Sequence, residues 1–144
     1  MTDIKSNIYQ RILAVTADVK SFGKDSQNTQ FNFKYASVEQ VVAVISPVCV
    51  QHGIVLLFEA DILPPATNIN KNGQIQLAMV MGKLTAVNVD EPSDRIVVSL
   101  PAAGFDTLDK GIYKALSGAR KYAIFSMFNL MTGSDDPETN VDIS

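Results

Sequence analysis

One uninterrupted stretch, from Asp106 to Leu130, most constrains what this chain can fold into. It reads DTLDKGIYKALSGARKYAIFSMFNL, and the next proline is Pro137. Asp106 suits the N-cap position and Gly133 supplies a stop signal, so the pattern predicts one long helix. At about 100° per residue, its small and apolar residues gather on one side. These residues are Ile112, Ala115, Leu116, Ala119, Ala123, Met127 and Leu130.

Basic residues lie on the opposite side of this predicted helix. Lys110, Lys114 and Lys121 fall within roughly 40° of one another, about 180° from the apolar side. Arg120 and Tyr113 lie on a flank between the two sides, and Tyr122 is expected on the buried side. The simplest interpretation of this stripe is a solvated helix surface, and the alternative is a surface that binds phosphate.

The composition indicates a folded domain and no membrane span. The chain has 144 residues, of which 47% are hydrophobic, enough for a core of its own. Its longest apolar runs are five residues, whereas a membrane-spanning helix needs about 20. The N-terminal MTDIKSNIYQ lacks the apolar region of a signal peptide. Cys49 is the only cysteine, which excludes an intramolecular disulfide and favours a cytoplasmic setting.

The charge is unevenly distributed along the chain. A net charge of −3 disfavours a generally basic nucleic-acid-binding protein. Four of the 15 acidic residues lie in the segment 135–144, however, so residues 1–134 keep 11 acidic and all 12 basic residues, a net charge of +1. We therefore expect one domain over residues 1–134, followed by an acidic tail without regular structure at 135–144. Phosphate binding would then depend on local clusters of basic residues.

The first part of the chain is expected to form a helix, a loop and a short extended segment. Apolar residues recur at three- and four-residue spacing over residues 4–20, as in an amphipathic helix. Residues 21–30 are polar and indicate a loop, after which three aromatic residues alternate with polar ones. These aromatics either anchor the loop to the core or form, with nearby lysines, a groove for bases and phosphates. The residues concerned are Lys24, Phe31, Phe33, Lys34 and Tyr35.

A second helix is predicted to begin after Ser37, which has Gln40 in the spacing of a capping box. It carries a wide apolar face, and Pro47 within it should kink or divide it. Gly53 suits the left-handed position after the helix end. A lone histidine with no second His or Cys nearby is a poor metal site, so we interpret His52 as a helix-end residue.

Three successive strands predict an antiparallel meander. They cover Ile54–Leu63, roughly Ile75–Val89 with a bulge near Gly82, and Arg95–Leu100. The segment 66–74 between the first two reads as a loop that ends in a turn. The element order predicts an α+β fold, a three-stranded antiparallel β-meander with two N-terminal helices and a long C-terminal helix. The helices should pack on one face of the sheet.

The sequence lacks the motifs of several enzyme classes. It contains no GxxxxGK[ST] or GxGxxG phosphate loop, no cysteine cluster for zinc, and no recognisable Ser–His–acid pattern. Four acidic residues could bind magnesium as in a nuclease. A helix from 106 to 130 would be about 36 Å long, however, and would keep the pair at its start apart from the pair after its end. These residues are Asp106, Asp109, Asp135 and Asp136. We therefore expect no catalytic residue, no cofactor and no metal.

Three segments, taken together, resemble a known family. They are FKYASVEQVVAVISPVCVQHGI at residues 33–54, DKGIYKALSGARKYAIFSMFNL at 109–130, and the acidic TGSDD at 132–136. They are similar, in the same order, to segments of the Erf (essential recombination function) family of phage single-strand DNA annealing proteins. The likeness covers most of residues 1–136. This chain departs from the family at Ser117-Gly118, where members commonly have Thr-Tyr, and many members carry a separate C-terminal region. Gly118 either weakens the helix, by up to about 1 kcal/mol relative to alanine, or permits the close approach of a backbone, a neighbouring subunit or DNA.

The resemblance implies a function that needs no bond-making enzyme. Erf proteins bind single-stranded DNA without sequence preference, pair complementary strands without ATP, and assemble into rings or related homo-oligomers. The resemblance also implies a fold similar to the eukaryotic annealing recombinases and a place in the bacterial host cytoplasm. It suggests a single-strand-binding protein or a phage exonuclease as further partners. On this basis the candidate DNA-binding residues are Lys24, Lys34, Tyr35, Lys110, Lys114, Arg120 and Lys121.

Two other classes of function stay open at this point. The same scaffold could belong to a phage structural or regulatory interaction protein that self-assembles and binds no DNA. A magnesium-dependent nuclease that uses the acidic residues is the third class. An annealing assay at low salt, combined with a mass measurement in solution, would separate the three.

Overall fold

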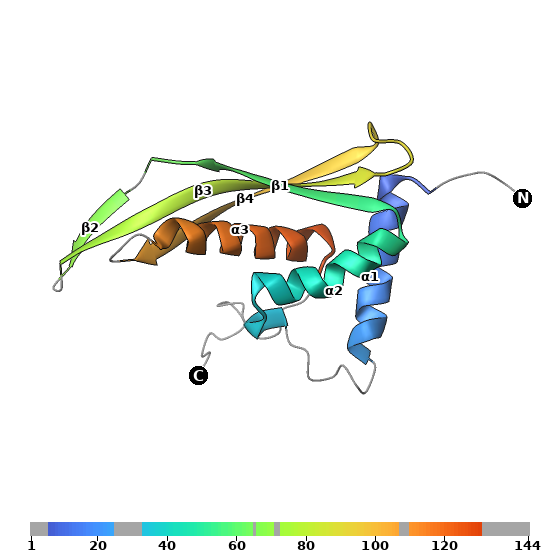
Figure 1. Ribbon diagram of the computed structural model, residues 1–144, viewed down its shortest axis with the longest axis horizontal. Coiled ribbons are helices and arrows are strands. Elements are labelled where there is room, and N and C mark those ends of the chain that lie inside the picture. Colours follow the sequence, from blue (N-terminus) through green and yellow to red (C-terminus); the bar gives the residue numbers. More distant parts are fainter. Residues whose placement is uncertain (1–5, 25–32, 65, 71–72, 107–109, 131–144) are drawn as a thin grey trace, which may run out of the picture.

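The structure, a computed structural model, describes residues 6–24, 33–64, 66–70, 73–106 and 110–130. These residues form an α+β fold in which α-helices lie along one side of an antiparallel sheet (Figure 1). The last helix follows the strands, so the predicted fold class is confirmed. In chain order the elements are α1 (Ile8–Lys24), the short 3₁₀-helix η2 (Phe33–Tyr35), α2 (Val38–Gln51), β1 (Ile54–Ile62), β2 (Ala66–Asn70), β3 (Gly73–Asn88), β4 (Arg95–Asp106) and α3 (Gly111–Met127).

The four described strands are arranged in three antiparallel rows. The long strand β3 occupies the middle row and pairs with every other strand. On one side, its residues 80–88 pair with β1 and its residues 73–77 pair with β2. On the other side, its residues 76–87 pair with β4. The three rows correspond to the predicted meander, and β2 extends the row that β1 begins.

Strand β2 occupies part of a segment that we predicted to be a loop. The first strand ends before the prolines at 64–65, as expected, and the Leu63 N–H still donates to the Met79 carbonyl at 2.9 Å. Proline has no N–H to give to a ladder, so the row breaks at this dipeptide. Pairing with β3 then resumes, from Ala66 opposite Leu77 to Asn70 opposite Gly73.

The predicted bulge near Gly82 is wrong. Gly82 lies opposite Ala60 on one side and Leu100 on the other, and the register continues past it without a slip. A Cβ at this position would lie 2.9 Å from the Cβ of Ala119 and 3.0 Å from the Phe58 ring. Glycine is therefore needed here because α3 approaches the sheet closely, which is the other common reason for glycine inside a strand.

The predicted start of the long helix is also wrong. Asp106 is the last residue of β4 and not an N-cap, and α3 begins at Gly111 with Lys110 as its N-cap residue. The strand continues past Pro101. An edge strand tolerates a proline because the backbone nitrogen, which lacks a hydrogen, can face away from the ladder. At Gly104 a Cβ would lie 2.3 Å from the Gly111 carbonyl oxygen. This close passage of the two backbones brings the helix start down onto the end of β4.

The end of α3 differs from the prediction in its stop residue. Phe128 is the C-cap residue, and Asn129 adopts the left-handed conformation with φ of 55°. Asparagine is among the few residues that take this conformation readily. The predicted stop, Gly133, lies outside the described residues.

The N-terminal segments also shift relative to the prediction. Helix α1 continues to Lys24, into the predicted loop. Residues 33–35 form a 3₁₀-helix and not an extended segment. The Phe33 ring packs on the core and meets the Phe125 ring edge-to-face at 5.7 Å, while Tyr35 is 77% exposed. The anchoring role is thus confirmed for Phe33, the groove role of Tyr35 stays a prediction, and Phe31 lies outside the described residues.

Helix α2 has the predicted caps. The Ser37 hydroxyl accepts from the Gln40 N–H, and the Gln40 side chain accepts from the Ser37 N–H, which completes the capping box. The helix is continuous through Pro47, so the predicted division does not occur. His52 is the C-cap residue, as expected, with its Nε2 atom 2.6 Å from an Asp18 carboxylate oxygen. Gly53 takes the left-handed conformation, with φ of 68°.

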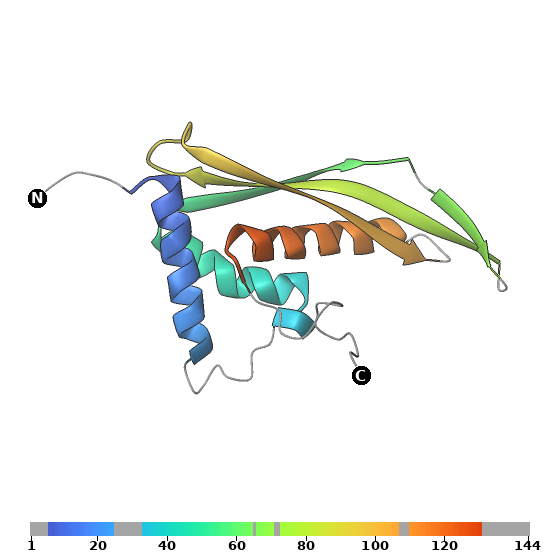
Figure 2. The same cartoon turned by 180° about the vertical axis from the view of Figure 1, so that it is seen from behind.

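The core lies between the inner face of the sheet and the helices. Helix α1 stands across the direction of α3, at the end of the sheet that holds the β3–β4 turn (Figure 2). Its apolar side packs with α2 and the second half of α3 over β1 and β3. The largest fully buried side chains are Phe128, Ile8, Ile45, Leu84, Ile124, Val15, Val41 and Val80.

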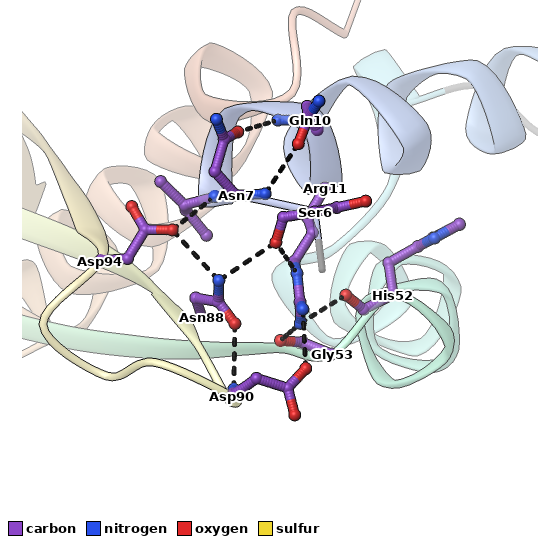
Figure 3. A network of polar contacts seen from close by, with 10 residues as sticks. Ser6, Asn7, Gln10, Arg11, His52, Gly53, Asn88, Asp90 and Asp94 are labelled. Carbon is purple, nitrogen blue, oxygen red and sulfur yellow. Dashed lines mark hydrogen bonds and ion pairs between the residues drawn. The ribbon is translucent and has the colours of Figure 1, made fainter. Parts of the chain in front are cut away.

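A polar network around Arg11 fastens α1 to two turns of the chain (Figure 3). The Arg11 guanidinium donates to the Ser6 carbonyl at 2.8 Å, the Gly53 carbonyl at 3.1 Å and the Asp90 carboxylate at 2.7 Å. The Asp94 carboxylate accepts from the Ile8 N–H at the helix start, at 2.8 Å. The charged group is therefore buried with its donors satisfied, as the burial of an ion requires.

The outer face of the sheet carries exposed apolar side chains. Residues of β1 and β4 alternate between this face and the core, so Val55, Leu57, Val97 and Phe105 are all more than two-fifths exposed. Within the described ranges, no helix combines the length and the apolar character needed to cross a membrane.

Candidate nucleic-acid interface

The lysines of α3 lie on the side of the helix away from the sheet. Ala115 and Ala119 are buried on the sheet side, whereas Lys110 and Lys114 are exposed and Lys121 is half-buried. The Lys114 ammonium donates to the Phe105 carbonyl at 3.1 Å, which holds it beside the end of β4.

Two adjoining grooves run along this side of α3. The first, which we call the lysine groove, is lined by Lys110, Tyr113, Lys114 and Ser117. The second, the interhelical groove, lies between α3 and the start of α2 and has a volume of about 310 Å³. Ser117 lines both grooves, so they form one continuous surface. The interhelical groove is lined by Ala36, Ser37, Val38, Glu39, Ser117, Gly118, Lys121 and Tyr122.

Exposed aromatic rings accompany the lysines in these grooves. Tyr113 is 67% exposed in the lysine groove, and Tyr122 is 48% exposed in the interhelical groove. The Lys121 ammonium lies 5.6 Å from the centre of the Tyr122 ring and 5.9 Å from that of Phe125. Phe125 is buried and meets Tyr122 edge-to-face at 5.6 Å, so it supports the ring from behind. The surface thus offers positive charge and aromatic faces side by side, the combination that binds single-stranded nucleic acid.

The start of α3 carries basic residues close to the N-terminus of the helix. A helix carries a partial positive charge at its N-terminus, where acidic residues stabilise it and basic residues destabilise it by roughly 0.3–1 kcal/mol each. The first turn of α3, all of it described, holds no acidic residue, and Lys110 and Lys114 flank it.

The structure separates Arg120 from the three lysines of α3. Arg120 is exposed and lines an apolar cleft of about 300 Å³ between α2 and β1, together with Val42, Val50 and Leu56. It therefore belongs to a different surface from Lys121, its neighbour in sequence. Sequence reasoning paired the two residues because the family motif contains both.

The remaining candidates lie before α2. Tyr35 is exposed and directly precedes Ala36, which lines the interhelical groove. Lys24 is the last residue of α1, and Lys34 is the middle residue of η2. The side chains of these two lysines lie outside the described part of the structure.

Sequence reasoning did not select two tyrosines that the structure brings to this surface. Tyr113 was placed on a flank of the helix, and Tyr122 was expected on the buried side. Tyr122 is instead half-exposed, because the start of α2 leaves a groove beside it. The sequence signal for Tyr122 is its place next to Lys121 in a helix rich in alanine. That signal does not tell which element of the fold lies opposite the tyrosine.

The acidic residues considered for magnesium are not placed together by the described structure. Asp106 ends β4, and its side chain lies outside the described part; Asp109, Asp135 and Asp136 lie outside the described residues altogether. Among the residues that are described, no group of three or more His, Cys, Asp or Glu side chains could hold a metal ion.

Comparison with known families gives one match. The sequence model of the ERF superfamily matches residues 8–144, nearly the whole chain. Comparisons with curated proteins and with solved structures give no match.

Proposed function

The chain belongs to the ERF superfamily, and on this premise we propose that it binds single-stranded DNA without sequence preference and anneals complementary strands without ATP. Membership confirms the resemblance drawn from the KYAS and ARKYA segments and supports a role in recombination by strand annealing. The sequence-independent binding, the independence from ATP and the residues involved are our proposal.

The observation that carries this proposal is the row of lysines and tyrosines along the outer side of α3. The lysine groove and the interhelical groove together present Lys110, Lys114 and Lys121 with Tyr113 and Tyr122. Lysines can pair with phosphates of any sequence, and an aromatic ring can stack with any base. Contacts of this kind hold the backbone and leave base edges free to pair with a complementary strand.

Self-association would compensate for the low charge of a single subunit. Residues 1–134 carry a net charge of only +1, so one copy should bind DNA weakly. Weak sites repeated in an assembly gain avidity. Exposed apolar surface marks candidate contacts between copies, and it occurs at Tyr9 and Leu13 of α1 and at Leu57 and Val97 on the outer face of the sheet. We propose that copies assemble through such surfaces into a ring or a related homo-oligomer.

The test measures binding and annealing by matched charge variants. The first variant changes Lys114 and Lys121 to glutamine. The control changes Lys83 and Arg95 to glutamine, since these two residues lie on the outer face of the sheet and carry the same total charge. Each phosphate contact on single-stranded DNA contributes about 0.7 to the slope of log affinity against log salt. We expect the first variant to lower that slope by about 1.4 and to slow annealing, and the control to change neither.

Two results would count against the proposal. Failure of the unmodified chain to shift an oligonucleotide or to accelerate annealing at low salt would refute the function. Equal effects of the two charge variants would refute the assignment to α3 and leave the function standing.

A second candidate function is a phage interaction protein that assembles without DNA. The exposed apolar side chains of the outer sheet face favour it, because such patches are typical of protein contacts. A mass in solution above that of one chain, combined with no DNA shift at low salt, would support this candidate over annealing.

A further inference from the structure

Gly118 is unlike the other glycines of the fold. Glycine is the least favourable residue inside a helix apart from proline, and Gly118 lies in the middle of α3. A Cβ added to Gly82, Gly104 or Gly111 would meet another atom at 3.0 Å or less, whereas one added to Gly118 would meet nothing within 4 Å. The described part of the subunit therefore gives no steric reason for glycine at position 118.

The space above Gly118 is part of the interhelical groove. Lys121 and Tyr122 follow one turn later on the same wall, and Ser37 and Glu39 line the wall formed by the start of α2. The groove volume of about 310 Å³ lies at the lower end of the roughly 300–1,000 Å³ found for small-ligand sites. The groove is thus bordered by the Lys121 ammonium, the Tyr122 ring and the helix backbone at Gly118.

We infer that the interhelical groove seats one nucleotide of the bound single strand, with its base against Tyr122, its phosphate at Lys121 and its sugar over Gly118. This inference rests on the proposed function and names the place within that surface where one nucleotide is held. Glu39 lines the α2 wall of the groove, and its carboxylate repels phosphate. The phosphate therefore lies on the Lys121 wall, and the base stacks by its face on Tyr122, which leaves its edge free to pair.

This assignment predicts opposite effects of one substitution on stability and on binding. Gly118→Ala should raise the melting temperature by about 2–4 °C, since alanine favours the helix and its methyl group has space. The same methyl group enters the nucleotide space, so the Kd for a fluorescein-labelled oligothymidylate should rise several-fold. Gly118→Leu should raise the Kd further. Loss of one stacked base corresponds to roughly 5- to 150-fold in Kd, which is the effect expected for Tyr122→Leu.

Ser126→Ala is the matched control, because Ser126 is exposed on the same helix and does not line the groove. It should leave the Kd unchanged. Equal Kd values for the unmodified chain, Gly118→Ala and Gly118→Leu would overturn the nucleotide seat while DNA binding itself stands. Absence of binding by the unmodified chain would overturn the proposed function and this inference with it. A several-fold higher Kd in a Gly118→Ala protein of raised melting temperature supports the seat, since damage to the fold would lower that temperature.

Discussion

Replacing Arg11 with methionine should strongly destabilise the fold. Methionine keeps an unbranched apolar stem but removes the guanidinium, whose side chain is only 8% exposed. Four anchoring bonds would be lost, to the carbonyls of Ser6, His52 and Gly53 and to the Asp90 carboxylate (Figure 3). These acceptors belong to the start of α1, the junction of α2 with β1 and the β3–β4 turn. The substitution therefore removes the tie between three separate parts of the chain.

The expected loss follows from the burial of each partner. Removing one member of a buried ion pair costs about 3–5 kcal/mol. The Asp90 side chain is 37% exposed, however, so water can solvate the carboxylate that is left behind. We therefore expect Arg11→Met to lower the free energy of unfolding by about 2–4 kcal/mol. This is a large part of the roughly 5–15 kcal/mol that stabilises a typical domain.

Urea unfolding followed by circular dichroism measures this loss. Arg95→Met is the control, because Arg95 is exposed and donates to the Pro92 carbonyl close by in the sequence. The stability that this variant loses should stay within about 0.5 kcal/mol. Asp90→Asn should cost less than Arg11→Met, since the guanidinium keeps its carbonyl acceptors. The double variant should show coupling of about 0.5 kcal/mol or more. A loss below about 0.5 kcal/mol for Arg11→Met would refute the reasoning and mean that water replaces the guanidinium without penalty.

Three further predictions concern single positions. Gly104→Val should destabilise the protein by about 3 kcal/mol or more, because the valine Cβ would overlap the Gly111 carbonyl oxygen. Thermal unfolding measures this loss, and an unchanged melting temperature would contradict the close passage of β4 and α3. Ser37→Ala should cost about 1 kcal/mol through loss of the capping bond to Gln40, whereas Ser37→Asp should retain most of the stability. Burial raises the pKa of Cys49 to about 12, so at pH 8 its thiol stays protonated and an aromatic disulfide reagent should modify the native protein only as fast as it unfolds. Rapid modification without denaturant would show that the thiol is accessible.

Local sequence signals determined several features because each depends on neighbours within a few residues. The capping box at Ser37, the left-handed Gly53 and the placement of His52 at a helix end all follow from side chains close in sequence. The alternation of apolar residues likewise predicted the three rows of the sheet. The apolar side of α3 was correctly assigned at Ala115 and Ala119, since a helix of known period orients its residues by itself.

The sequence by itself also determined the family, and with it the recombination role, through the KYAS and ARKYA segments. It did not determine which residues share a surface. Tyr122 is exposed and Arg120 lies in a separate cleft, because the start of α2 lies beside Tyr122 and its second half lies near Arg120. Contacts between elements that are distant in the chain decide which groove each of these side chains lines. The helical period cannot predict those contacts.

The surroundings of Gly82 and Gly118 were also decided by the tertiary structure. In the sequence Gly82 indicated a bulge and Gly118 a weak point in a helix. Once the chain is folded, Gly82 is the point where α3 meets the sheet, and Gly118 borders an open groove. Because glycine has no side chain, the polar or apolar pattern around Gly82 and Gly118 does not predict what packs against them. What approaches the backbone at each of them is a property of the packed fold.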